Sequence, residues 1–177
     1  MTHRFLICCA AVLLAASAAI VADESLRIVP IVRDDTVFVS FELADSLPDD
    51  VRGAISSGLR TTVTYQIELR MIVPIWIDRT IATTLVSVSD QYDNLTRRHA
   101  LSRMVDGRVE DTLVTEDESI ARRWLTRLSR MPLCETSKLE PNRDYYVLIS
   151  ARARPHGSSL FGWVNTIVGK AKFTFIP

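Results

Sequence analysis

The residues best suited to chemistry lie together in one short stretch, SDQYDNLTRRH, at residues 89–99. Carboxylates beside an imidazole can transfer protons, and adjacent guanidinium groups can bind an anion. The groups concerned are Asp90, Asp93, Arg97, Arg98 and His99. The same composition is also typical of a polar turn with charged strand ends. Both interpretations stay open, and the turn is the simpler one.

Other patterns of catalytic or metal-binding residues are missing from the sequence. It contains no phosphate-binding glycine loop, no zinc-ligand spacing and no Gly-x-Ser-x-Gly motif. Cys134, in MPLCETS, has no activating neighbour in the sequence, so we expect a buried thiol rather than a nucleophile. The sequence therefore predicts a protein that is not an enzyme and that needs no metal or cofactor.

A second candidate site is the apolar stretch SSLFGWVNTIVGK, residues 158–170. Its apolar residues recur at the spacing of one face of a short helix, and basic residues stand at alternating positions before and after it. An apolar lobe beside a basic patch would suit contact with an anionic membrane surface. Alternatively, the lobe folds back as a lid over a sheet. The predicted contact residues are Arg152, Arg154, Leu160, Phe161, Trp163, Lys170 and Lys172.

The first 22 residues have the pattern of a secretory signal peptide. A short segment with one arginine precedes the apolar run FLICCAAVLLAASAAIVA, which ends in small residues where a peptidase could cut. We therefore predict export to the periplasm or the medium, with the mature chain beginning near Ala19 or Asp23. The alternative is an uncleaved anchor in the inner membrane.

Composition limits the remaining possibilities. Lys plus Arg and Asp plus Glu are both 21, so the balance of charge gives no reason to expect nucleic acid as a partner. An apolar fraction of 47% allows a substantial core, and we expect one domain from residue 23 to residue 177.

The elements that must position these residues are mostly strands. Alternating apolar residues predict a hairpin over residues 26–43, with Pro30 marking an edge strand. A short amphipathic helix follows over residues 46–59, capped by Ser46 and stopped by Gly58. Four strands then form an antiparallel meander over residues 61–115, with a tight turn at Asp106-Gly107.

The C-terminal part predicts one more helix and one more hairpin. Thr115 and Glu118 form a capping box for a helix over residues 115–131, in which Trp124 faces the core. Two last strands cover residues 144–153 and 170–177, joined by the apolar stretch. The expected fold is thus α+β and β-rich: an antiparallel sheet or sandwich of about eight strands with two short amphipathic helices, in the order ββα ββββ α ββ.

Four motifs occur in a characteristic order, namely WIDRTIA, YDNLTRRH, EDESIARRWLTRL and LEPNRDYYVLISAR. In this order they resemble an exported bacterial family catalogued as domain of unknown function 4390. The matching positions are Trp76, Asp78, Tyr92, Leu95, Thr96, Leu139, Pro141 and Tyr145. His99 departs from the family, which more often has a tyrosine there. The resemblance implies an envelope protein without assigned activity or catalytic residues.

Three hypotheses about function follow. The first is a non-enzymatic binding or interaction domain of the cell envelope, whose partner is an unknown envelope protein. The second is a peripheral membrane protein that contacts lipid through residues 158–170. The third is a hydrolase that would recruit His99 or His156 as its base.

Overall fold

The computed structural model describes residues 26–43, 47–155 and 166–176. These residues form nine strands, two α-helices and one 3₁₀ helix. In chain order they are β1 (Leu26–Arg33), β2 (Thr36–Leu43), α1 (Asp49–Ser56), β3 (Thr61–Met71), β4 (Arg79–Asp93), β5 (Arg98–Val105), β6 (Arg108–Thr115), α2 (Glu118–Thr126), β7 (Arg127–Glu135), η1 (Thr136–Lys138), β8 (Arg143–Pro155) and β9 (Ile167–Phe175).

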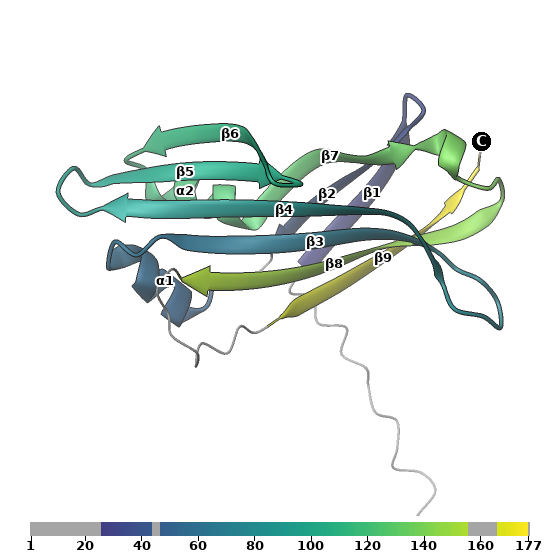
Figure 1. Cartoon of the computed structure of the whole chain (residues 1–177), viewed down its shortest axis with the longest axis horizontal. Coiled ribbons are helices and arrows are strands. Elements are labelled where there is room, and N and C mark those ends of the chain that lie inside the picture. Colours follow the sequence, from purple (N-terminus) through teal and green to yellow (C-terminus); the bar gives the residue numbers. More distant parts are fainter. Residues whose placement is uncertain (1–25, 44–46, 156–165, 177) are drawn as a thin grey trace, which may run out of the picture.

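The strands form two antiparallel sheets. The large sheet has the order β6-β5-β4-β3-β8-β9, and the small sheet has the order β1-β2-β7. One face of the large sheet, here called the inner face, is covered by the small sheet at one end and by the two helices at the other (Figure 1). The β-rich α+β fold expected from the sequence is therefore confirmed, with one strand more than anticipated.

Strict alternation on β3 explains why the inner face holds the core. Val63, Tyr65, Ile67, Leu69 and Met71 are all buried, whereas the residues between them are polar and lie on the outer face. The Tyr65 ring packs on Phe41 of β2 at 4.7 Å between centroids. Its hydroxyl donates to the Leu125 carbonyl of α2 at 2.6 Å. A single side chain thus joins both layers.

Most of the predicted turns and pairings are confirmed. β1 and β2 form the expected hairpin, and β1, with Pro30, is an edge strand of the small sheet. β3 to β6 form the expected meander, and the turn at Asp106-Gly107 has positive φ angles of 48° and 82°. Gly58 has a φ of 79° just after α1. The last two strands pair as a hairpin.

The predicted helix over residues 115–131 is wrong at both ends. The N-cap is Asp117, whose carboxylate accepts from the Ser119 N–H at 2.7 Å, and α2 ends at Thr126. The chain continues as β7, in which Leu128, Met131 and Cys134 face the core.

Two irregularities in β7 explain this error. Leu128 lies opposite Phe41 and Met131 lies opposite Val39, so β7 has one residue more than β2 in this interval. A second register shift follows before Cys134. A bulge of this kind changes the spacing of inward-facing residues from two to three, and a spacing of three looks helical in the sequence.

The start of α1 and the position of Trp124 were also predicted. α1 begins after Pro48, which makes no side-chain capping bond, and the predicted cap Ser46 lies outside the described residues. Trp124 is partly buried and packs against the core as expected, with the Arg103 guanidinium 4.3 Å above its ring.

Candidate functional site

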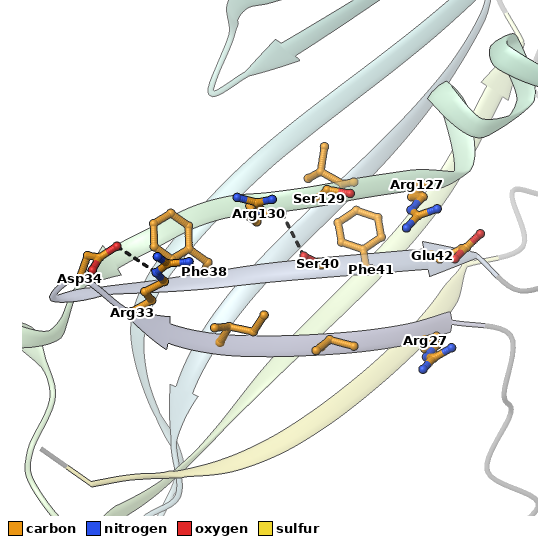
Figure 2. A pocket seen from close by; sticks show the side chains of 13 residues that line it. Arg27, Arg33, Asp34, Phe38, Ser40, Phe41, Glu42, Arg127, Ser129 and Arg130 are labelled. Carbon is orange, nitrogen blue, oxygen red and sulfur yellow. Dashed lines mark hydrogen bonds and ion pairs between the residues drawn. The ribbon is translucent and has the colours of Figure 1, made fainter.

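The outer face of the small sheet carries a groove with an apolar floor. Alternation along β1 leaves Val29 and Ile31 on this face, exposed by 42% and 45%, and Phe38 of β2 lies beside them. The groove has a volume of about 810 Å³ and is open to solvent. We call these three residues and the arginines around them the β1–β7 groove (Figure 2).

Four arginines frame the β1–β7 groove. Figure 2 shows Arg27 and Arg127 at one end, and Arg33 and Arg130 toward the other end. Arg130 has a φ of 51°, and its N–H donates to the Ser40 hydroxyl at 3.0 Å. A left-handed backbone is strained in a residue other than glycine, asparagine or aspartate. The bulge therefore holds Ser129 and Arg130 together at the groove, where a regular strand would turn one of them inward.

The groove is net positive. Only two carboxylates, those of Asp34 and Glu42, line it beside the four arginines. Asp34 pairs with Arg33 at 3.2 Å, and both side chains are well exposed. Among the described residues, Arg27, Arg127 and Arg130 have no ion-pair partner within 4.0 Å. An apolar strip between cations suits a partner that combines acidic and apolar groups.

Sequence reasoning missed this groove, although part of it is visible in RIVPIVR. Arg27, Val29, Ile31 and Arg33 alternate, so they had to share one face of the strand. The other two arginines could not be found, because the predicted helix assigned Arg127 and Arg130 to its last turn.

The tip of the β3–β4 hairpin is a second unusual surface. Ile75, Trp76 and Ile77 follow one another there and are exposed by 104%, 80% and 82%. Asp78 fixes the tip: its carboxylate accepts from the Val73 N–H at 3.2 Å and from the Tyr146 hydroxyl at 2.8 Å. These hydrogen bonds hold the pKa of Asp78 below its usual value.

A third feature is a pocket between the helices and the inner face of the large sheet. Asp90 of β4 is 1% exposed and His99 of β5 is 6% exposed. The His99 Nδ1 lies 2.9 and 3.1 Å from the two oxygens of Asp90, and both residues line a pocket of about 320 Å³. Burial raises the pKa of Asp90, although the hydrogen bond from His99 opposes this effect.

The structure thus divides the predicted chemical cluster. Asp93 is the last residue of β4, and its carboxylate accepts from the Leu95 and Thr96 N–H groups of the turn that follows, at 2.8 and 3.3 Å, as expected of a polar turn. Asp90 and His99 instead face inward as a buried pair. The turn interpretation therefore holds for Asp93. It is wrong for Asp90 and His99, whose side chains point to the inner face of the large sheet because of the alternation along β4 and β5.

The predicted basic residues share the outer face of the large sheet. Arg152 and Arg154 of β8 are exposed there, as are Lys170 and Lys172 of β9. The Lys170 ammonium lies 3.5 Å from the centre of the Tyr146 ring. The apolar residues predicted beside them, Leu160, Phe161 and Trp163, lie outside the described residues.

The other motif residues build turns and contacts at the ends of strands. The Tyr92 ring packs on His99 at 4.7 Å between centroids. Leu139 and Tyr145 are buried, and the Tyr145 hydroxyl accepts from the Glu140 N–H at 2.7 Å. Leu95, Thr96 and Pro141 are exposed. Three of the four ordered motifs thus include a turn between strands, whereas EDESIARRWLTRL forms α2 and the start of β7.

The described residues contain no group of three or more His, Cys, Asp or Glu side chains that could hold a metal ion. Cys134 is buried as expected, and burial raises the pKa of its thiol. No helix within the described ranges has the length and apolar character needed to cross a membrane.

The comparisons with known proteins give a family and no activity. The model of the family described as Domain of unknown function (DUF4390) matches residues 24–158, which include every strand except β9 and all eight motif positions. No curated protein and no solved structure matches the chain. With most of its length matched, the chain belongs to the DUF4390 family.

Proposed function

We propose that this protein is a non-catalytic binding domain of the cell envelope, which holds an extended segment of a partner protein in the β1–β7 groove. The observation that carries the proposal is the apolar strip of Val29, Ile31 and Phe38 between two pairs of arginines (Figure 2).

The spacing of the arginines defines the partner segment. Arg27 and Arg33 are six positions apart on one extended strand, which corresponds to about 20 Å at the rise of a strand. A partner strand lying along β1 would therefore present acidic side chains about six residues apart, with apolar side chains between them. Charge pairs at the rim of such an interface accelerate association and weaken with salt.

Crosslinking from within the groove tests the proposal. A photoreactive phenylalanine analogue at Ile31 is expected to capture one partner in the cells that produce the protein. Val168 is a matched control, because it is 49% exposed, close to the 45% of Ile31, and belongs to β9 of the large sheet. The same analogue at Val168 should not give this product.

Charge reversal at the arginines is the second part of the crosslinking test. Arg27→Glu combined with Arg127→Glu should abolish the crosslink from Ile31, because it removes one pair of cations from the groove. A product that forms equally from both positions, or that survives the reversal, would contradict the proposed site.

Export is part of the proposal and is tested separately. The apolar run before Asp23 supports a cleaved signal peptide. We expect the protein in the periplasmic or secreted fraction, with a mature N-terminus near Ala19 or Asp23. A full-length chain found in the inner membrane would instead identify residues 1–22 as an anchor.

A further inference from the structure

We propose that the tip of the β3–β4 hairpin, Ile75–Trp76–Ile77, inserts into the interfacial region of a lipid bilayer. Single exposed apolar side chains are normal on protein surfaces, but a contiguous exposed group indicates a contact site. Here three large apolar side chains are consecutive, and each is exposed by at least 80%. This inference is independent of the β1–β7 groove.

The exposure of the tip is fixed by the fold. The Asp78 carboxylate joins the tip to the Val73 N–H on one side and to Tyr146 of β8 on the other. The Trp76 N–H also donates to the Val73 carbonyl at 3.3 Å, which closes a turn. A tip held in this way is already in its contact conformation, so little conformational freedom is lost when it binds.

The shape of the tip favours a bilayer over a protein partner. In Figure 1 the β3–β4 connection extends past the end of the large sheet as a convex projection. A protein would need a matching hollow to cover it, whereas a bilayer admits a convex tip directly. Tryptophan prefers the membrane interface, and aliphatic side chains gain by entering the acyl region beside it.

A second apolar side chain lies at the same end of the molecule. Ile176 is 75% exposed and follows β9, whose last carbonyl, on Phe175, accepts from the Asn142 N–H. The Ile72 N–H donates to the Asp144 carbonyl, which connects the start of β8 to the end of β3. Ile176 and the tip therefore both belong to this end of the large sheet.

The charges beside the tip indicate what drives the binding. Arg79 and Arg143 both pair with Glu140, at 2.8 and 3.5 Å, so one carboxylate offsets part of the positive charge beside the tip. We therefore expect apolar insertion to dominate, with little dependence on anionic lipid or on salt. This expectation differs from contact through the basic patch of residues 152–172, which would require anionic lipid and would weaken with salt.

Vesicle flotation tests the inference. The purified protein without residues 1–22 is mixed with phosphatidylethanolamine–phosphatidylcholine vesicles, with and without phosphatidylglycerol, at low and high NaCl concentrations. We expect flotation under all four conditions. Trp76→Ser should reduce the partition coefficient by about tenfold or more, since burying one large apolar side chain contributes at least that factor.

Leu95→Ser is the matched control. Leu95 is 94% exposed, and it lies in the turn after β4, at the opposite end of that strand from the tip. This variant should float like the wild type. Circular dichroism establishes that both variants remain folded, which we expect because the replaced side chains are almost fully exposed.

Quenching by brominated lipid identifies the residue that inserts. Quenching of tryptophan fluorescence should occur in the wild type and should disappear in Trp76→Phe, which keeps an apolar ring for binding. Absence of wild-type flotation, equal loss in Leu95→Ser, or quenching that persists in Trp76→Phe would each overturn the inference. Loss of flotation only in the double variant Phe161→Ala, Trp163→Ala would assign membrane contact to residues 158–170 instead.

Discussion

Replacing His99 by leucine should expose how strongly the fold depends on the buried Asp90–His99 pair. Leucine keeps most of the bulk of the side chain and removes the imidazole nitrogens. Among the described residues, His99 is the only hydrogen-bond partner of the Asp90 carboxyl group. The variant therefore leaves a carboxylate that is 1% exposed without its donor.

The size of the effect follows from burial. Removing the hydrogen-bond partner of a buried group typically costs about 1–3 kcal/mol, and more when the group is charged. Both residues line a pocket of about 320 Å³, which can admit water to the orphaned carboxylate. We therefore expect the free energy of unfolding to fall by about 3 kcal/mol, which for a chain of this size lowers Tm by roughly 6–12 °C.

The effect should also depend on pH in a defined direction. Desolvation raises the pKa of Asp90 and the hydrogen bond from His99 opposes the rise, so the variant should have a still higher pKa. A carboxyl group whose pKa is raised in the folded state favours folding while it is protonated and loses this advantage as the pH rises through that pKa. The deficit of the variant should therefore be largest near neutral pH and should shrink toward acid.

Urea unfolding across a pH series measures both quantities. Asp90→Asn combined with His99→Leu serves as the control, because an amide cannot ionise and the free energy of unfolding of this double variant should carry no contribution from the titration of residue 90. A loss below about 1 kcal/mol for His99→Leu, or a loss that does not change with pH, would refute the reasoning, since an unpaired buried carboxylate costs more than that.

The same unfolding assay checks three further variants. Gly169→Val should lower the free energy of unfolding by about 1–3 kcal/mol, because a Cβ there would lie 2.9 Å from side-chain atoms of both Leu26 and Ile28. An unchanged unfolding midpoint would mean that β1 and β9 move apart easily. Gly53→Ala should raise the free energy of unfolding by about 0.5–1 kcal/mol, since this helical position has nothing within 4 Å of the new Cβ. A lower free energy of unfolding would contradict the assignment of α1. Tyr65→Phe should lower the free energy of unfolding by about 1–3 kcal/mol, because it removes the hydrogen bond to the buried carbonyl of α2. An unchanged free energy of unfolding would show that this carbonyl accepts from another donor.

The sequence predicted those parts of the fold that depend on neighbouring residues. Alternation identified the buried face of β3, and the Asp106-Gly107 pair located a hairpin, because both signals act over a few residues. The edge position of β1 followed from Pro30, which lacks the N–H that an inner strand must donate.

The remaining parts depend on contacts between distant segments. β7 is a strand because β2 is available as its partner, and its irregular spacing conceals this from a local search. The Asp90–His99 pair forms because β4 and β5 bring the two side chains to the covered side of the sheet. The groove requires arginines from β1 and β7, which are about a hundred residues apart in the chain. Such sites need the topology before they can be recognised.

The one-sided covering of the large sheet also governs which parts of the molecule open first. β6 is an edge strand on which nearly every residue is exposed, including Val109 and Val114 at 62% and 64%. β3 lies between β4 and β8, with its inner residues almost completely buried. Few covered contacts imply a small free energy for local opening. The amide hydrogens of the β5–β6 hairpin should therefore exchange with solvent through local fluctuations, whereas those of β3 should exchange only when the whole domain unfolds.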